Sequence, residues 1–558
     1  MDTGRSNGGK RLEGHGGELA VAVAQSHGVR AMFTLSGGHV FPLYDGAVKA
    51  EPPLPLIDVR HEQTAVFAAE GLAKLTRTPG LAVLTAGPGV TNGVSAVATA
   101  HFNGSPLLVM GGRAPQFRWG AGALQELDHP PLLAPITKRA ATVHGPDRIA
   151  AEVDDALSTA TTPHRGPVFL DVPMDHLFSR AEVELPPPPR PIAVEPDGEA
   201  LDVAARALAQ AHRPVLVLGS DVWAGDAQDA ARELAEELSL PVIANGMGRG
   251  ILGPGHRLLV TRARGRAFGA ADLVIVVGTP LDFRLGYGTF GGKDGAPPAA
   301  IVHVVDDAGQ AAGHVETAAT VAGDLALSLA GLRSRVSAGG PHPDAAAWAA
   351  DLRAAHEQAI AGDADLLTSA SQPIHPARIY GALVPLLAED AVVIGDGGDF
   401  VSFAGKYVEP ARPGTWLDPG PYGCLGTGLG YAVAARLAHP SSQVVLLLGD
   451  GAAGFSLMDV DTLVRHRLPV VMVVGNNGIW GLEKHPMRFL YGYDVAAELR
   501  PQTRYDQVVT ALGGAGELVT RPEDLDPALR RAFATDVPYC VNVVTDPAVA
   551  YPRTTTGI

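Results

Sequence analysis

The chain has 558 residues, of which 46% are hydrophobic and 18% charged, so it can bury the cores of several domains. A net charge of −16 argues against a nucleic-acid partner, and two cysteines make a disulfide framework or a structural zinc site implausible. No apolar run approaches the roughly 20 residues of a membrane span, and the glycine-rich N-terminus has no apolar signal segment. We therefore expect a cytoplasmic protein without a membrane partner.

The first predicted domain covers residues 12–182 and alternates short apolar runs with helical patterns. Strands are expected at residues 31–35, 81–84, 107–110 and 168–170. Residues 64–75 are predicted to form a helix between the first two of these strands. Such alternation predicts a parallel α/β sheet. Glycine-rich loops, at residues 36–39 and 86–92, follow two of the strands.

A proline run at residues 186–189 predicts a stiff linker to a second domain, expected at residues 196–335. Its strands are predicted at residues 215–218, 273–277 and 301–305. An unpatterned stretch around residues 334–343 leads to a third domain, expected at residues 373–558. The sequence thus predicts three α/β domains, each built on a parallel sheet.

Two loops of the third domain carry the strongest chemical signal. The apolar run 444–448 ends in Gly-Asp-Gly-Ala-Ala at residues 449–453, and the run 470–474 leads to Asn-Asn-Gly-Ile at residues 476–479. One helix is predicted between them, at residues 455–464. Both loops should emerge at the carboxyl ends of neighbouring parallel strands, where open α/β sheets bind ligands.

The residues of these loops suit a metal and a phosphate group. A glycine-rich turn that opens a helix offers backbone N–H groups to phosphate. Asp450 supplies a carboxylate oxygen, Asn477 an amide oxygen, and a carbonyl just beyond it a third oxygen. Mg²⁺ is usually held by a few such oxygens together with phosphates. Either loop alone would read as an ordinary Asp-Gly or Asn-Gly turn. Together they favour a metal–diphosphate site.

This pair of loops resembles the signature of thiamine diphosphate (ThDP) enzymes. The resemblance implies that Asp450, the Asn477 side chain and the Ile479 carbonyl bind Mg²⁺. It assigns diphosphate to the turn that consists of Gly449, Asp450, Gly451, Ala452 and Ala453. It also implies that the three domains are, in chain order, a pyrimidine-binding domain, a central domain similar to nucleotide-binding domains, and a diphosphate-binding domain.

Glu62 is the expected partner of the aminopyrimidine ring. The segment Arg60-His61-Glu62 resembles the one that supplies this glutamate in the family. The alternative is a solvated helix N-terminus, where acidic side chains are favoured in any case. In the family the glutamate and the diphosphate motif of one site come from different subunits. The resemblance therefore implies at least a homodimer, and commonly a homotetramer.

Three further segments resemble cofactor-binding parts of the family. They correspond to the loop beside the pyrimidine, a second diphosphate loop, and the segment that bends the cofactor. The residues concerned are Gly87 and Pro88, then Gly398, Asp399 and Phe400, and finally Gly423 and Leu425.

Two branches of the family compete for the substrate. Residues 125–128 and 282–284 resemble the large subunit of acetolactate synthase. Three stretches resemble oxalyl-CoA decarboxylase and 2-hydroxyacyl-CoA lyase, at residues 454–462, 476–480 and 281–288. Helix packing alone would also preserve the first of these three. Taken together they favour the acyl-CoA branch.

The favoured reaction is cleavage of a 2-hydroxyacyl-CoA into an aldehyde or ketone and formyl-CoA. The alternative is an acetolactate synthase that condenses two pyruvates. A third reading is a catalytically silent regulatory protein of the same fold. The presence of Glu62, Asp450 and Asn477 argues against that third reading.

Glu483 is the favoured residue for proton transfer, because it lies six residues past Asn477, where the related pyruvate decarboxylases carry an active-site glutamate. The resemblance thus implies a position close to the reacting group, as a general base requires. A solvent-facing pair of Glu483 and Lys484 is the alternative. Gln125 and His39 are expected to orient polar groups of the substrate, although a capping or surface role suits His39 as well.

Apolar residues of the substrate pocket are expected at Leu127 and Trp480. The chain after Tyr491 is a candidate lid, because it follows the metal loop. In the central domain the resemblance implies ADP for the acyl-CoA branch or FAD for the synthase branch. The candidate contacts are Gly219, Ser220, Arg284, Asp306 and Asp307, each of an ordinary loop type.

Overall fold

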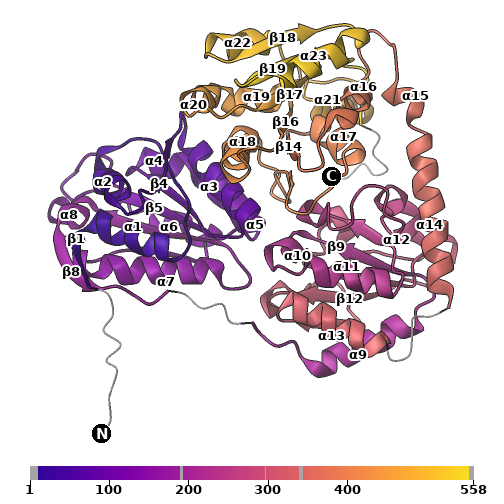
Figure 1. The fold of residues 1–558 in the computed structure, drawn as a ribbon, viewed down its shortest axis with the longest axis horizontal. Coiled ribbons are helices and arrows are strands. Elements are labelled where there is room, and N and C mark those ends of the chain that lie inside the picture. The colour runs from indigo at the N-terminus through magenta and orange to yellow at the C-terminus, as the bar shows by residue number, and fades with distance from the viewer. Residues whose placement is uncertain (1–10, 189–192, 296, 338–342, 552–558) are drawn as a thin grey trace. The chain divides into compact units, whose positions relative to one another are not determined.

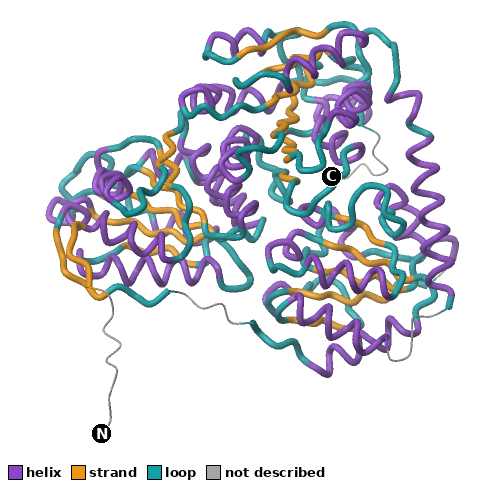
Figure 2. The backbone as a smooth tube through the Cα atoms, viewed as in Figure 1, coloured by secondary structure: helices purple, strands orange, loops and turns teal. Residues whose placement is uncertain are grey.

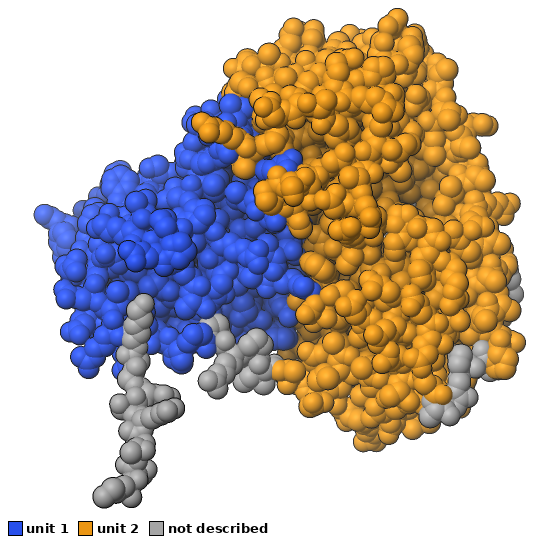
Figure 3. Space-filling view, viewed as in Figure 1, with its two compact units in different colours: residues 1–191, 422–438, 458–466 blue, residues 192–421, 439–457, 467–558 orange. Residues whose placement is uncertain are grey.

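The computed structural model describes residues 11–188, 193–295, 297–337 and 343–551. The chain forms two compact units, which Figure 3 shows in different colours. Unit 1 comprises the N-terminal residues up to 191 together with residues 422–438 and 458–466. Unit 2 comprises residues 192–421, 439–457 and 467–558. None of the helices within the described ranges is long and apolar enough to cross a membrane.

Unit 1 contains a parallel sheet of six strands in the order β3-β2-β4-β5-β7-β6. Figure 1 labels β4 and β5 of this sheet. The strands are β2 (Met32–Thr34), β3 (Leu56–Asp58), β4 (Gly80–Leu84), β5 (Leu107–Arg113), β6 (Arg139–Thr142) and β7 (Pro167–Pro173). Every residue of β4, β5 and β7 is buried, as expected when helices cover both faces of a parallel sheet. A separate antiparallel pair joins β1 (Arg11–His15) to β8 (Arg180–Glu184).

Helices flank this sheet (Figure 2). They are α1 (Gly16–Ser26), α2 (Phe41–Lys49), α3 (Glu62–Thr76), α4 (Pro88–Asn92), α5 (Val94–Phe102), α6 (Pro130–Leu133), α7 (Ile149–Thr161) and α8 (Met174–Phe178). Unit 1 also includes α18 (Thr427–Ala438) and α20 (Val460–Arg465). The predicted helix 64–75 is confirmed as α3, which begins at Glu62 because the His61 side chain accepts a hydrogen bond from the Gln63 N–H.

Unit 2 contains two parallel sheets. The central sheet has the order β10-β9-β11-β12-β13. Its strands are β9 (Pro214–Leu218), β10 (Val242–Ala244), β11 (Leu273–Val277), β12 (Ala300–Val305) and β13 (Ala319–Ala322). Alternate residues of β9 enter different cores: Leu216 and Leu218 pack in one hydrophobic cluster, and Val215 and Val217 in another. This alternation follows from the two-residue period of a strand.

The helices around the central sheet are α9 (Gly198–Gln210), α10 (Ser220–Ala224), α11 (Gln228–Glu237), α12 (Arg264–Ala270), α13 (Leu325–Ser337) and α14 (Asp344–Ala361). The stretch 334–343 was predicted to lack a pattern, yet α13 continues through Ser337. Val336 is buried there, which explains why the helix extends so far. Residues 338–342 lie outside the described residues, as does Pro189 of the predicted linker.

The C-terminal sheet has the order β15-β14-β16-β17-β19-β18, again parallel throughout. Its strands are β14 (Val392–Asp396), β15 (Trp416–Leu417), β16 (Val444–Gly449), β17 (Val471–Asn476), β18 (Ala515–Val519) and β19 (Tyr539–Val544). The helices of this region in unit 2 are α15 (Ala364–Leu367), α16 (Pro376–Leu383), α17 (Asp399–Tyr407), α19 (Asp450–Ser456), α21 (Gly481–Tyr491), α22 (Tyr505–Ala511) and α23 (Leu525–Phe533).

Two predictions for the C-terminal region need correction. The chain after Tyr491 was a candidate lid, but β18 and β19 belong to the sheet, and Val541 and Val543 are fully buried in its core, so these strands are not part of a lid. The end of that segment, residues 552–558, lies outside the described residues. The single helix predicted at residues 455–464 is instead divided into α19, a short 3-10 turn and α20. The prediction of three parallel α/β sheets is confirmed.

Candidate functional site

The sheet of unit 1 has a topological switch point between β2 and β4. The chain continues from β2 to β3 on one side and to β4 on the other, so the loops after β2 and β4 diverge from one crevice. The two loops meet where His39 Nδ1 lies 3.2 Å from Thr85 Oγ1. His39 and Gly87, which sequence reasoning selected separately, therefore belong to neighbouring loops at the position where such folds bind ligands.

Glu62 lies at the start of α3 and is 7% exposed. Its Oε2 accepts a hydrogen bond of 3.0 Å from Asn92 Nδ2, at the end of α4. No hydrogen bond to Oε1 is found among the described residues. One carboxylate oxygen is thus fixed by the protein, and the predicted bond of the other to the aminopyrimidine ring stays a prediction. Sequence reasoning missed Asn92, although it lies in the predicted glycine loop 86–92.

The conformation of the Gly87 loop is set by a buried histidine. Gly87 has a φ of +57°, a region that glycine enters without penalty. Its N–H donates to Nε2 of His129 over 3.0 Å, and Nδ1 of His129 contacts Asp171 Oδ2 at 2.9 Å. Because Nε2 accepts, the ring proton belongs on Nδ1. Arg113 also donates to Asp171, over 2.7 Å. Sequence reasoning missed these three side chains.

The polar candidates around this loop have different surroundings. Gln125 is half-buried, has a φ of 59°, and its backbone lies against Gly87. His39 is buried, and burial lowers the pKa of its imidazole below the ordinary 6.5, although a backbone hydrogen bond at Leu124 acts in the opposite direction. Leu127 is 39% exposed in unit 1. The substrate roles predicted for these side chains stay predictions.

The two predicted metal loops lie in unit 2, where Asp450 opens α19 directly after β16. The Asp450 side chain is 3% exposed, and its two oxygens accept backbone N–H bonds from Gly478 (2.7 Å) and Gly451 (3.0 Å). The bond to Gly478 joins the two predicted loops across 28 residues of sequence. No ion pair of Asp450 is found within the described ranges, and burial raises the pKa of its carboxyl to about 6.

The neighbouring oxygens complete a suitable ligand set. Asn477 Oδ1 accepts the Ile479 N–H over 3.1 Å, which holds the amide oxygen at the loop. No described residue donates a hydrogen bond to the Ile479 carbonyl. The backbone bonds on either side of it use the Gly478 carbonyl and the Trp480 N–H. A buried carboxylate without a cation, an amide oxygen and a free carbonyl together fit a hard divalent ion such as Mg²⁺.

Large side chains pack on the glycines of these loops. A Cβ atom at Gly451 would lie 2.5 Å from the Trp480 ring, and one at Gly475 would lie 2.4 Å from the Phe400 ring. Trp480 is half-buried and meets Phe455 edge to face, with ring centroids 6.4 Å apart. The predicted pocket residue Trp480 therefore packs on the turn that was predicted to bind diphosphate.

The other predicted cofactor contacts lie in both units. In unit 2, Gly398 caps α17, Asp399 begins that helix, and the Phe400 carbonyl accepts a bond of 2.8 Å from the Tyr380 hydroxyl. In unit 1, Gly423 and the half-buried Leu425 lie in the loop before α18. Pro88 is the first residue of α4.

Glu483 lies in the first turn of α21 and is exposed. The alternative pair with Lys484 is wrong, because Lys484 forms ion pairs with Glu498 and Asp494. The role of Glu483 in proton transfer stays a prediction.

The central sheet has its own switch point, between β9 and β11. Gly219 follows β9 there and donates to the Val277 carbonyl over 2.9 Å, while Ser220 Oγ accepts the Met247 N–H. Asp306 is buried directly after β12, and Asp307 is exposed. The Arg284 guanidinium is already bound to both carboxylate oxygens of Asp282.

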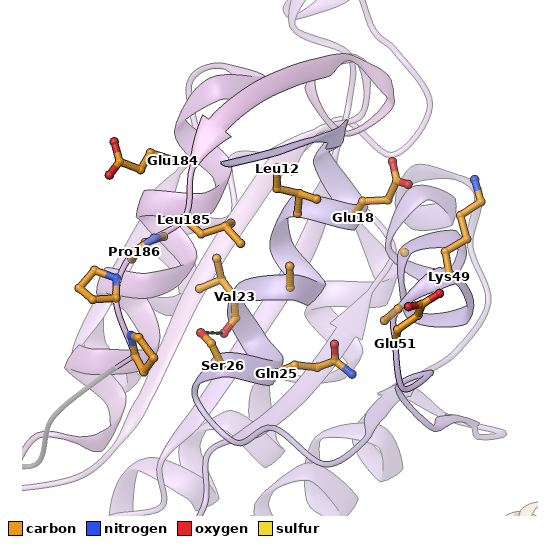
Figure 4. Close-up of a pocket in the computed structure, with 15 residues that line it drawn as sticks. Leu12, Glu18, Val23, Gln25, Ser26, Lys49, Glu51, Glu184, Leu185 and Pro186 are labelled. Carbon is orange, nitrogen blue, oxygen red and sulfur yellow. Dashed lines mark hydrogen bonds between the residues drawn. The ribbon is translucent and has the colours of Figure 1, made fainter. Parts of the chain in front are cut away.

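Unit 1 contains a cavity of about 880 Å³, whose lining residues are drawn in Figure 4. It is lined by β1, α1, the end of α2 and the segment after β8, including Leu12, Val23, Lys49 and Leu185. None of the predicted site residues lines it.

Known families match all three domains. The N-terminal thiamine pyrophosphate-binding domain matches residues 14–132, the central domain of these enzymes matches residues 201–332, and the C-terminal thiamine pyrophosphate-binding domain matches residues 396–543. The three matches occur in the predicted order.

Curated relatives cover nearly the whole chain. The acetolactate synthase large subunit IlvG of Mycobacterium tuberculosis and a probable acetolactate synthase of Mycobacterium bovis are each 51% identical over 97% of this chain and 97% of their own. The 2-hydroxyacyl-CoA lyase 2 of Caenorhabditis elegans is 34% identical over 90% of this chain and 84% of its own. The chain therefore belongs to the thiamine pyrophosphate enzymes.

Proposed function

We propose that the chain is a ThDP- and Mg²⁺-dependent enzyme that condenses two 2-oxo acids, with the formation of acetolactate from pyruvate as its first activity. The identity of 51% with a mycobacterial acetolactate synthase large subunit, over 97% of both chains, carries this proposal. The 2-hydroxyacyl-CoA lyase 2 relatives reach 34%. The synthase thus replaces the lyase that the sequence motifs favoured.

The contacts of one of those motifs support giving it less weight. Residues 454–462 looked typical of the acyl-CoA branch, but Asp459 binds Arg60 and Thr64, and Thr462 binds Asp459. These contacts hold α3 in place whatever the substrate is. Similarity in this stretch therefore reports helix packing, which weakens it as a guide to the reaction.

The proposed roles of the residues concern two ends of the cofactor, the diphosphate and the pyrimidine ring. Asp450, the Asn477 amide and the Ile479 carbonyl would hold Mg²⁺, and the turn at residues 449–453 would hold the diphosphate. Glu62, oriented by Asn92, would hold or move a proton at the pyrimidine ring nitrogen. When bound, ThDP supplies the carbanion chemistry by acting as an electron sink.

The test is turnover of the purified protein with ThDP and Mg²⁺. Pyruvate alone should give CO₂ and acetolactate, and omission of either cofactor should abolish the product. The matched control is Asp450→Ala, which removes a proposed metal ligand. Absence of acetolactate from wild-type protein that binds ThDP would overturn the synthase proposal.

A 2-hydroxyacyl-CoA lyase is the second candidate, favoured by the 34% identity to lyase 2 sequences over 90% or more of this chain. In this reaction an acyl-CoA partner binds, and an aldehyde or ketone and formyl-CoA are the products. Incubation with formyl-CoA and acetone, without pyruvate, distinguishes the two. A 2-hydroxyacyl-CoA product without acetolactate would assign the lyase.

The central domain is proposed to hold a nucleotide at the β9–β11 switch point, near Gly219 and Ser220. A synthase of this family would carry FAD there, whereas the acyl-CoA branch would carry ADP. A yellow protein with a flavin spectrum would support FAD. Arg284 contributes little in the observed arrangement, because Asp282 neutralises it.

We also propose at least a homodimer, and commonly a homotetramer, because in this family one site contains residues of two subunits. Light scattering of the purified protein checks this. A stable monomer with full turnover would contradict it.

A further inference from the structure

We propose that Asp459 is a positioning residue that fixes Glu62 at the start of α3. The inference rests on the proposed function to the extent that Glu62 serves the pyrimidine ring. Asp459 lies in residues 458–466, which belong to unit 1 although they follow the diphosphate turn in sequence. We call this segment the clasp.

The carboxylate of Asp459 binds the chain on both sides of Glu62. Its Oδ1 accepts the backbone N–H of Arg60 over 2.7 Å, and its Oδ2 accepts the Thr64 hydroxyl over 2.6 Å. Arg60 precedes Glu62 by two residues, and Thr64 follows it by two. One rigid group therefore sets the direction in which α3 starts, and with it the direction of the Glu62 side chain.

Further contacts hold the clasp against the loop that leads to Glu62. Arg465 donates to both oxygens of the Asp58 carboxylate, at 2.8 and 2.7 Å, and to the Asp58 carbonyl at 3.0 Å. His466 contacts the same carboxylate at 3.0 Å. The loop between β3 and α3 is thus bound at its beginning by one end of the clasp and at its end by Asp459.

The burial of Asp459 argues that its position is costly to maintain. The side chain is 1% exposed and forms no ion pair in the described part of the chain, and its partners are one N–H and two hydroxyls. Removing a carboxylate from water without a cation is unfavourable. Hydrogen bonds to an ionised carboxylate are also shorter and stronger than those between neutral groups. Both properties suit a group that must hold its partners at fixed positions.

Glu70 is a matched control on the same helix. It is fully buried and accepts hydrogen bonds from Asn103 (2.8 Å), Ser105 (3.1 Å) and the Tyr431 hydroxyl (2.9 Å). It therefore anchors α3 about as firmly as Asp459 does, but eight residues beyond Glu62. Loss of Glu70 should lower the stability of α3 without changing the direction of its first residues.

The experiment compares Asp459→Ala, Asp459→Asn and Glu70→Ala in the full chain. Hydrogen–deuterium exchange of residues 58–64, measured without cofactor, reports the local order directly. Asp459→Ala should exchange faster there, whereas Glu70→Ala should match the wild type. With ThDP and Mg²⁺, Asp459→Ala should lose about 100-fold in kcat, the effect of misplacing a catalytic group by about 1 Å. Asp459→Asn should recover most of this loss, because the amide oxygen can still accept the Arg60 N–H, and the amide NH₂ can donate to the Thr64 hydroxyl oxygen with that bond reversed.

Two results would overturn the proposal. One is unchanged exchange at residues 58–64 in Asp459→Ala. The other is an equal fall in kcat for Asp459→Ala and Glu70→Ala, which would reduce Asp459 to a general stabiliser. If the wild type converts neither pyruvate nor an acyl-CoA substrate, the proposed function fails, while the exchange experiment still decides the role of Asp459.

Discussion

The Glu62 region and the Asp450 region prepare their carboxylates in different ways. Asp450 is held by backbone N–H groups of Gly451 and Gly478, which belong to its own loop and the next one. Glu62 is held by side chains, directly by Asn92 and at the helix start by Asp459. A backbone-made site survives many side-chain changes, whereas a side-chain-made site depends on particular residues far apart in sequence.

Replacing Asp450 should have the largest effect, because no other side chain duplicates its role. Loss of a residue that only orients a metal ligand costs about 10–100-fold in metal affinity, so loss of the ligand itself should exceed about 100-fold. The Mg²⁺ affinity of Asp450→Ala is measured by titration in the presence of ThDP, with tryptophan fluorescence as the signal. Asp155→Ala, an exposed aspartate of unit 1, is the control. Unchanged Mg²⁺ affinity would remove Asp450 from the metal site.

Asn92→Ala should affect the Glu62 region next most strongly. A buried carboxylate oxygen left without its donor costs about 1–3 kcal/mol. The expected result is a lower free energy of unfolding together with a lower kcat. Urea denaturation and steady-state kinetics check both. Asn92→Gln offers the same amide on a longer side chain and should lose activity too, because the 3.0 Å bond cannot be kept without a shift. Full activity in both variants would show that Glu62 needs no such partner.

Gly451→Ala tests whether the backbone-made region also depends on packing. The new methyl group would lie 2.5 Å from the Trp480 ring, and overpacking of this kind costs typically about 1–3 kcal/mol. The double variant Gly451→Ala/Trp480→Leu should recover part of the loss, because the smaller side chain vacates that space. Thermal unfolding of both single variants and the double variant gives the coupling free energy between the two substitutions. If the stability losses of the two single variants simply add in the double variant, contact with the Trp480 ring is not what destabilises Gly451→Ala.

The smallest effect is expected from His39, which lies in unit 1 beside the Gly87 loop. Burial lowers the pKa of His39 from 6.5 in the folded protein, so the unfolded chain binds the proton more readily. Stability is therefore fully present above pH 6.5 and declines as the pH falls through that value toward the lower folded pKa. His39→Gln should show a shallower decline of the unfolding midpoint between pH 7 and pH 5. Parallel profiles would exclude this contribution.

Sequence reasoning found what local patterns encode. The apolar runs predicted strands in each of the three sheets, and Asp450 and Asn477 were recognised because each directly follows such a strand. The remaining strands of the sheets were not predicted, namely β3, β6, β10, β13, β14, β15, β18 and β19. Sequence reasoning also missed Asn92, Asp459 and His129, whose partners are 30, 399 and 42 residues away. No periodicity reports contacts of that length. For a related reason, sequence reasoning included β18 and β19 in the candidate lid, since the burial of β19 depends on its neighbour β17 in the sheet.

The packing of Phe400 on Gly475 has an evolutionary consequence. With 2.4 Å between a new Cβ atom and the ring, neither position can gain volume unless the other loses it. The two residues lie on different secondary-structure elements and 75 positions apart, so a single mutation would rarely satisfy both. Across homologous sequences, an alanine at position 475 should therefore be accompanied by a side chain smaller than phenylalanine at position 400.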